Sequence, residues 1–193
     1  MSDDAYRELK CDPHLGDVVE EHGPLSLDPA DDPFERLVVS IVNQQLSTSA
    51  AATIRDRLFE RVEVTPAGLL AADEAVLGDC GLSNQKIGYV RNVAEAFQDG
   101  FSAESLRAMD DDDVIDSLTE IRGVGVWTAK MFLIFVLARE DVFPVEDLGI
   151  RRGMERVFGF DVDTVSRGTM RERAAKWTPY RSYASLYLWR SVD

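Results

Sequence analysis

The sequence has few cysteines and no long apolar run, and these absences exclude several classes of protein. Only two cysteines, Cys11 and Cys80, occur in 193 residues, too few for a disulfide framework or a four-cysteine iron–sulfur cluster. No apolar run approaches the roughly 18 residues of a membrane span. The acidic first residues lack the apolar segment of a secretory signal. These absences predict a cytoplasmic protein that has no membrane partner.

Lysine is also scarce, and the charge is unevenly distributed. The chain holds 17 Arg but only four Lys, and its net charge is −14. Such a charge argues against a nucleic-acid partner, because phosphate binding needs cations. Residues 148–193, however, carry nine basic and five acidic side chains, whereas residues 1–147 carry 12 basic and 30 acidic ones. Composition alone favours an acidic protein that avoids DNA, of the Lys-poor kind typical of salt-loving organisms.

The apolar pattern is helical throughout. Asp32-Pro33-Phe34-Glu35 combines a capping side chain, a proline at the first helical position and a glutamate three residues after the cap. Thr65-Pro66 and Thr178-Pro179 repeat the cap-and-proline signal. Further caps are expected at Asp73, Ser83, Ser102 and Asp110, and helix stops at Gly81 and Gly100. Because no segment alternates with period two, we expect an all-α fold of roughly ten short helices.

The most informative segment runs from Leu118 to Ala129 and reads LTEIRGVGVWTA. The glycines of Gly123-Val124-Gly125 permit a tight turn with positive φ. They also bring the backbone close to a ligand and leave amides pointing outward where the next helix begins at Val126, which makes an anion site. An ordinary helix connection with a glycine cap is the usual alternative for a bare G-x-G. The longer string is more specific than that.

This segment resembles the hairpin of the helix-hairpin-helix DNA glycosylase superfamily, most closely that of the 3-methyladenine DNA glycosylase II branch. The family's hairpin reads L-x-x-I-x-G-[VI]-G-x-x-T-A, which Leu118 through Ala129 match. The resemblance covers about residues 30–193 and implies a monovalent cation, Na⁺ or K⁺, on hairpin carbonyls, with no other cofactor. By position those carbonyls belong to Thr119, Ile121 and Val124. The implied contacts with DNA phosphate come from Gly123, Val124, Gly125 and Thr128.

Other segments extend the resemblance. Residues 39–47 resemble the family's helix and loop that enter the DNA, where Gln45 and Leu46 would contact DNA and Leu46 would fill the gap left by a flipped base. Core packing is the alternative for Leu46. The string Gly81-Leu82-Ser83-x-x-Lys86 also matches, with Lys86 either orienting the loop or contacting phosphate. The N-terminal β-rich subdomain of bacterial relatives has no counterpart, and residues 1–30 are expected to add little more than a helix or an arm.

The resemblance places the catalytic carboxylate at Asp147 and begins a basic, DNA-binding helix at Arg152. An aspartate at a helix N-cap accepts amide hydrogen bonds, and the helix dipole favours its ionised form. A fixed carboxylate can stabilise the oxocarbenium-like charge that develops as the N-glycosidic bond breaks, and can orient the attacking water. A simple helix cap would explain Asp147 without catalysis, and Glu146 is the rival carboxylate.

Trp127 occupies the position where bifunctional relatives carry a lysine that forms a Schiff base with the sugar. Lys130 lies roughly 300° further around the helix and cannot replace that lysine, so we expect base excision with water as the nucleophile. In the alkylation-specific branch, Trp127 and the aromatic residue aligned with Trp189 bind cationic alkylated purines by stacking and cation–π attraction. Met131 is expected on the pocket-facing side. Core packing is the alternative for both tryptophans.

The sequence thus predicts a monomeric, two-lobed, all-α hydrolase of the 3-methyladenine DNA glycosylase II type that acts on double-stranded DNA in base excision repair. Residues 1–34 and 141–193 would form one helical lobe and residues 35–140 the other, with Asp147, Trp127 and Trp189 in the cleft between them. One alternative is a relative that acts on uracil, hypoxanthine or mismatched thymine. Another is a non-catalytic helix-hairpin-helix module that only binds DNA.

Overall fold

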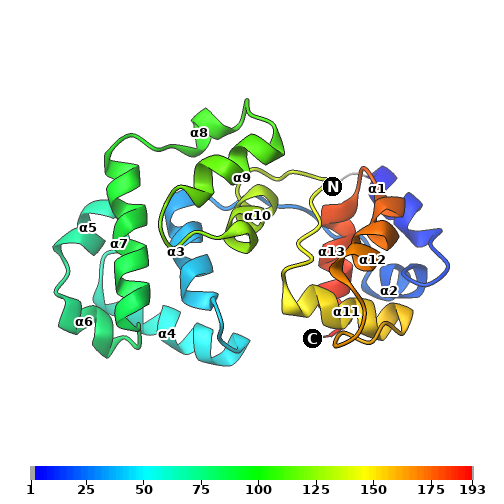
Figure 1. Ribbon diagram of the computed structural model, residues 1–193, viewed down its shortest axis with the longest axis horizontal. Coiled ribbons are helices and arrows are strands. Elements are labelled where there is room, and N and C mark those ends of the chain that lie inside the picture. The colour runs from blue at the N-terminus through cyan, green and yellow to red at the C-terminus, as the bar shows by residue number, and fades with distance from the viewer. Residues whose placement is uncertain (1–2, 193) are drawn as a thin grey trace. The chain divides into compact units, whose positions relative to one another are not determined.

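All the regular secondary structure in the described part of the chain is helical. The computed structural model describes residues 3–192, apart from the side chain of Thr48, and holds no β-strand within that range (Figure 1). The all-α expectation is therefore confirmed. In chain order the elements are α1 (Asp3–Lys10), α2 (Gly16–His22), α3 (Pro33–Asn43), α4 (Thr48–Arg61), α5 (Pro66–Ala71), α6 (Glu74–Asp79), α7 (Asn84–Gln98), α8 (Ala103–Leu106), α9 (Asp111–Thr119), α10 (Val126–Phe135), α11 (Leu148–Phe158), α12 (Arg167–Ala174), the 3₁₀ helix η1 (Ala175–Trp177) and α13 (Arg181–Arg190). None of these described helices is both long and apolar enough to cross a membrane.

Side-chain caps form at most of the positions where the sequence predicts them. The Asp32 carboxylate accepts hydrogen bonds from the backbone N–H groups of Phe34 and Glu35 at 2.8 and 3.0 Å, with Pro33 at the first position of α3. Asp110 also precedes its helix, α9, but in the described structure its side chain makes no capping hydrogen bond. Local side-chain chemistry therefore sets most helix starts. The other predicted caps that form are Thr65, Asp73, Ser83 and Ser102.

The expected helix start at Thr178-Pro179 is wrong. The chain forms η1 and a turn there, and α13 begins only at Arg181. A long-range contact fixes that start, because the backbone N–H and the guanidinium of Arg181 all donate to the Asp141 carboxylate. This tertiary contact overrides the local cap-and-proline signal.

The chain divides into two compact units. The terminal unit contains the residues up to Pro29 and from Ala138 onward, and the central unit contains Ala30–Leu137. The boundaries expected from the sequence, at residues 34 and 140, lie a few residues later. The terminal unit therefore combines segments from both ends of the chain in one core.

The central unit packs around α3 and α10. Helix α3 contacts α4, α7 and α10, and α10 also contacts α9. Helix α10 buries the four consecutive residues from Met131 to Ile134. The Gln44 side chain after α3 donates to the Gly123 carbonyl, so this packing brings the turn between α9 and α10 to the C-terminal end of α3. The buried face of α3 includes Phe34, Leu37, Val38, Ile41 and Val42.

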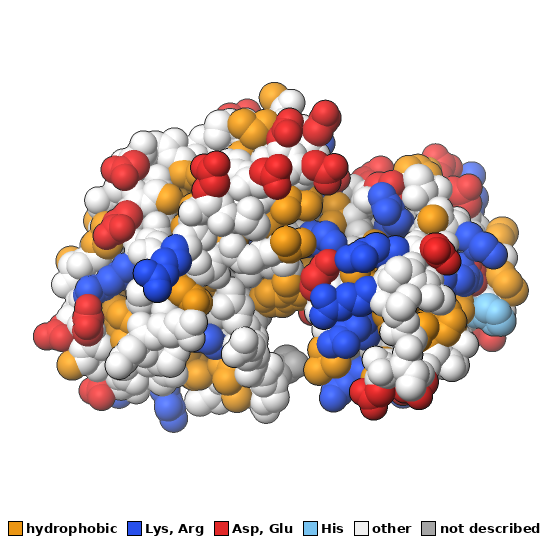
Figure 2. All heavy atoms as spheres, viewed as in Figure 1, with side chains coloured by type: hydrophobic (Ala, Val, Ile, Leu, Met, Phe, Trp, Pro, Cys, Tyr) orange, Lys and Arg blue, Asp and Glu red, His pale blue; other side chains and the backbone are white. Residues whose placement is uncertain are grey.

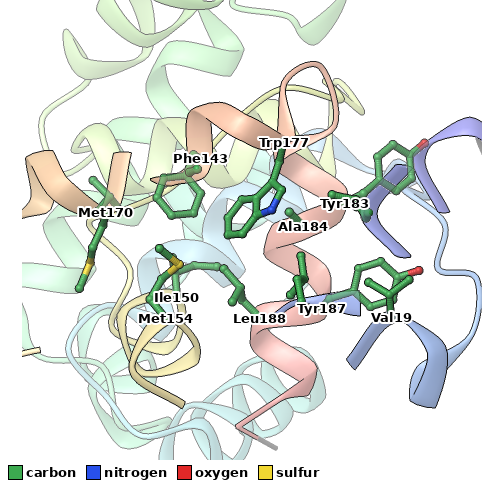
Figure 3. Packing of buried hydrophobic residues seen from close by; sticks show 14 of the residues in the cluster. Val19, Phe143, Ile150, Met154, Met170, Trp177, Tyr183, Ala184, Tyr187 and Leu188 are labelled. Carbon is green, nitrogen blue, oxygen red and sulfur yellow. The ribbon is translucent and has the colours of Figure 1, made fainter. Parts of the chain in front are cut away.

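The terminal unit buries α13 against α2 and α11 (Figure 3). The Tyr187 hydroxyl donates to the Gly23 carbonyl at 2.9 Å and accepts from the Leu25 N–H at 3.3 Å. The segment before residue 30 therefore contributes two helices and buried side chains, which is more than the helix or arm expected from the sequence. Its core residues include Val19, Ile150, Met154, Tyr183, Ala184, Tyr187 and Leu188.

A buried ion pair also joins segments distant in the sequence within the terminal unit. The Asp12 carboxylate accepts hydrogen bonds from Arg173 at 2.6 and 2.8 Å, from the Trp177 indole at 2.9 Å and from the N–H groups of His14 and Leu15. The Asp12 and Arg173 side chains are 8% and 14% exposed. Burial raises the pKa of Asp12, but these hydrogen bonds outweigh burial and lower it to about 2. The ionised carboxylate therefore stabilises the fold.

We predict that Asp12→Asn lowers the free energy of unfolding by about 3 kcal/mol, because it leaves Arg173 buried without its counter-charge. Since the folded-state pKa of Asp12 lies below the ordinary 3.8, the stabilisation is complete above that value and is lost as the pH falls towards 2. Urea unfolding across this pH range measures both effects.

The matched control is Asp17→Asn, which changes an exposed carboxylate on α2 and should cost less than about 0.5 kcal/mol. Equal losses in the two variants would contradict the stabilising role of Asp12. So would an Asp12→Asn variant whose stability falls with pH in parallel with the wild type.

Candidate functional site

The turn between α9 and α10 contains two glycines, and each has a different structural role. Gly123 has a φ of +109°, in the left-handed region that favours glycine, and a Cβ atom there would overlap the ring of Tyr89. Gly125 is the N-cap of α10 and has open space where a side chain would begin. In the part of the chain that is described, no side chain caps α10. This helix end therefore presents backbone amides with no capping side chain.

The loop between α3 and α4 meets this turn through Gln44. The Gln44 Nε2 donates to the Gly123 carbonyl at 2.9 Å and to the Thr128 hydroxyl at 3.0 Å. The next residue, Gln45, is exposed and has a φ of +57°, which is uncommon for a residue other than glycine. Leu46 follows with 40% of its surface exposed. Leu46 is therefore not a core residue, and the loop tip presents two side chains to solvent.

Lys86 approaches the same loop from α7. Its Nζ donates to the carbonyls of Val42 and Gln44 at 2.7 and 2.8 Å, at the C-terminal end of α3. Burial lowers the pKa of this ammonium group. The ammonium group of Lys86 therefore contacts the backbone where α3 passes into this loop.

The loop, the turn and α7 line an open pocket of about 460 Å³ in the central unit. The half-buried Trp127 lines this pocket, whereas Met131 lies in the core and is not part of its described lining. An indole beside the amides of a helix N-terminus can contact a flat ring and an anionic group together. Other lining residues include Gln44, Gln45, Lys86, Gly123 and Gly125.

Asp147 is the N-cap of α11 in the terminal unit. Its Oδ1 accepts hydrogen bonds from the backbone N–H of Ile150 and from the indole N–H of Trp189, each at 2.9 Å. Amide donors and the positive end of the helix dipole favour negative charge at this position. Asp147 therefore does cap α11. The indole adds a second, long-range constraint that a simple cap does not need.

The contact between Asp147 and Trp189 depends on Gly149, which was not predicted from the sequence. A Cβ atom at Gly149 would lie 2.9 Å from Cδ1 of Trp189 and 3.0 Å from Oδ1 of Asp147. A glycine in the first turn of a helix is a signal that could have found it, because glycine there lowers helix stability and needs a packing reason. Trp189 was expected to line the base pocket. The structure places its indole N–H on Asp147.

The charged side chains near Asp147 have other surroundings. Glu146, the rival carboxylate, pairs with Arg171 at 3.1 Å and is 18% exposed. Arg152 is exposed on α11. Lys and Arg side chains gather on the visible face of the terminal unit, whereas acidic side chains follow the region of α8 and α9 in the central unit (Figure 2). The negative net charge therefore coexists with a locally basic surface.

The expected cation site lies in the turn after α9. Thr119 ends α9, and the Ile121 carbonyl accepts a hydrogen bond from the Val124 N–H at 2.9 Å. Backbone carbonyl oxygens are ligands that alkali cations take in proteins. The donor chemistry of Thr119, Ile121 and Val124 thus fits Na⁺ or K⁺. Among the described residues, no cluster of His, Cys, Asp or Glu is suited to holding a metal ion.

An all-α chain with a glycine hairpin, followed by an aspartate that caps the next helix, belongs to a recognisable class of DNA repair protein. Residues 38–179 match the model of the HhH-GPD superfamily of base excision DNA repair proteins. The chain belongs to this superfamily, as its hairpin motif predicted.

Several relatives are named 3-methyladenine DNA glycosylases. The chain is 32% identical over 93% of its length to the putative DNA-3-methyladenine glycosylase YfjP of Bacillus subtilis, and spans 66% of that protein. It is 31% identical to DNA-3-methyladenine glycosylase 1 of Schizosaccharomyces pombe, over 83% of this chain and 72% of that protein.

Solved structures show the same likeness. The S. pombe 3-methyladenine DNA glycosylase Mag1, in complex with abasic DNA, is similar with a TM-score of 0.88 at 28% identity, covering 97% of this chain and 95% of that one. The DNA-3-methyladenine glycosidase of Bacillus halodurans gives a TM-score of 0.79 at 34% identity, over 98% and 90% of the two chains. The expected glycosylase fold is therefore confirmed.

We predict that Gly149→Ala displaces the indole of Trp189 from its carboxylate partner, because the added Cβ meets both groups. The chain has three tryptophans, so three indole N–H signals are expected in a ¹H–¹⁵N NMR spectrum, and single Trp→Phe variants assign them. The Trp189 signal should shift most. Gly78→Ala is the matched control, since open space surrounds Gly78, and it should leave all three signals in place. An unmoved Trp189 signal in Gly149→Ala would contradict the contact.

Proposed function

We propose that this chain is a monofunctional DNA glycosylase of the 3-methyladenine DNA glycosylase II type. It would hydrolyse the N-glycosyl bond of alkylated purines, such as 3-methyladenine and 7-methylguanine, in double-stranded DNA during base excision repair. The observation that carries the proposal is the Asp147 carboxylate, which two donors hold at the N-terminus of α11. The names of the relatives, DNA-3-methyladenine glycosylases, support the substrate class.

Asp147 supplies the negative charge that the reaction needs. As the bond between the base and C1′ breaks, the base leaves with the electron pair and positive charge develops on the sugar. A carboxylate near C1′ stabilises this charge and orients the water that attacks C1′. Because Ile150 and Trp189 both donate to Oδ1, the carboxylate is already held in one orientation before the bond breaks.

Trp127 bears on both the substrate and the nucleophile. Alkylation at N3 or N7 makes a purine cationic, so an electron-rich indole attracts the ring by cation–π interaction. A cationic base is also a good leaving group and does not require a general acid. Since Trp127 stands where a bifunctional relative has its Schiff-base lysine, water is the nucleophile and the strand is left intact.

DNA binding by an acidic chain requires local positive charge. The amides that Gly123 and Gly125 leave at the start of α10 provide such charge for a phosphate. A Na⁺ or K⁺ ion held by the carbonyls of the same turn would add to it. Arg152 contributes from the exposed side of α11. The exposed Leu46 would fill the gap that the flipped base leaves in the duplex.

We predict that Asp147→Asn slows the release of methylated purines on the order of 10³-fold, because it removes the charge that stabilises the transition state. Binding to the same duplex should change little. Free bases released from DNA treated with dimethyl sulfate are measured by mass spectrometry, and binding by fluorescence anisotropy.

Glu146→Gln is the matched control, because Glu146 is the neighbouring carboxylate and already pairs with Arg171. It should keep base release close to the wild-type rate. Retained excision by Asp147→Asn, or loss of excision in Glu146→Gln alone, would refute the assignment of Asp147.

A separate prediction concerns the nucleophile. Borohydride reduces a Schiff base to a stable amine, so it traps a lysine enzyme on its DNA. With Trp127 in the lysine position, no covalent adduct with DNA should form under conditions where the chain releases bases. A bifunctional 8-oxoguanine glycosylase on its own substrate is the positive control. A trapped adduct of this chain would exclude the monofunctional mechanism.

A further inference from the structure

One face of α7 contacts both the hairpin and the loop. Lys86, Tyr89 and Asn92 are spaced three residues apart and therefore share a helix face. The Asn92 side chain donates to the Arg122 carbonyl at 2.9 Å, and the Tyr89 ring lies where a side chain at Gly123 would be. Helix α7 thus contacts the hairpin at two points. Through Lys86, the same helix also contacts the loop between α3 and α4.

The contacts of Lys86 are with backbone carbonyls. Its Nζ lies 2.7 Å from the Val42 oxygen and 2.8 Å from the Gln44 oxygen. The last carbonyls of a helix lack helical partners, and a cation near them is favoured by the helix dipole. Two of the three N–H groups of the ammonium therefore donate to carbonyls at the C-terminal end of α3.

The loop tip beyond this contact is strained. The φ of +57° at Gln45 is an unfavourable backbone conformation for a residue other than glycine and persists only where the surroundings enforce it. Gln44, just before it, is anchored at its carbonyl by Lys86 and at its side chain by the hairpin. Ser47, which follows Leu46, caps α4. The exposed Gln45 and Leu46 thus lie between two anchored residues.

We infer that Lys86 is a positioning residue, which fixes the Gln45–Leu46 tip relative to the hairpin and does not itself bind phosphate. The inference rests on the proposed function in one respect, namely that this tip enters the DNA beside the flipped base. The hairpin sets where the DNA backbone lies, so Leu46 reaches the gap only if the loop and hairpin keep a fixed spacing. Misplacement by about 1 Å can slow a reaction 100-fold.

The test compares Lys86→Met with Lys10→Met, in which an exposed lysine on α1 loses the same charge. In Lys86→Met, amide hydrogens of residues 43–47 should exchange with solvent about 10-fold faster, because the loop opens more readily. Single-turnover base release from methylated duplex should slow between roughly 10- and 100-fold. The dependence of log Kd on log salt should keep its slope. Lys10→Met should change none of these.

A phosphate-binding role for Lys86 predicts the opposite pattern. Loss of one phosphate contact reduces the salt slope by about one and weakens binding to every DNA sequence, while the loop exchanges as before. That result would overturn the inference. If the wild type releases no base from any lesion, the proposed function fails, but hydrogen exchange and the salt slope still decide the role of Lys86.

If Lys86→Met does not fold, Lys86→Gln takes its place in every measurement, because it removes the charge but keeps a polar side chain. A further variant loosens the other anchor of the same loop tip. Gln44→Leu removes the side-chain donors to Gly123 and Thr128 but keeps the backbone carbonyl that Lys86 binds. It should speed exchange in the same five residues. In the double variant, the loss of rate should be smaller than the product of the two single losses, because one loosened loop accounts for both. If the loss of rate in the double variant equals the product of the two single losses, the two residues act independently, which would contradict the inference.

Discussion

The candidate chemistry depends on one hydrogen-bond acceptor that the fold holds from two directions. Oδ1 of Asp147 accepts the local amide of Ile150 and the distant indole of Trp189. A helix cap needs only the amide. The indole reaches Asp147 because Gly149 has no side chain in its path and because Leu188 and the other buried residues of α13 pack in the terminal core. The core formed by both ends of the chain therefore sets the position of the carboxylate.

The central unit uses side-chain donors on backbone carbonyls to the same end. Gln44 binds the Gly123 carbonyl, Lys86 binds the end of α3 and Asn92 binds the Arg122 carbonyl. These contacts fix a loop and a turn that each contain a left-handed residue. They also bear on how an acidic chain with the fold of a DNA repair protein would bind phosphate. Phosphate binding would depend on correctly placed amides and a local basic surface, and much less on net charge.

Features encoded in short strings could be predicted from the sequence, and features that need long-range packing could not. Caps such as Asp32 and the hairpin at Gly123 depend on neighbouring residues, and both formed as expected. The start of α13 depends on Asp141, some 40 residues away from Arg181, and the local signal at Thr178-Pro179 was therefore misleading. The same limit hid the bond between Asp147 and Trp189 and the pairing of Asp12 with Arg173.

The most direct test of the central claim is the product of the reaction on alkylated duplex DNA. The chain is incubated with methylated DNA, the free bases are identified by mass spectrometry, and the strands are analysed before and after alkali. The account predicts free 3-methyladenine or 7-methylguanine, and strands that break only when alkali cleaves them at the abasic sites that base release has left. No released base, or release confined to uracil or hypoxanthine from other substrates, would contradict the account.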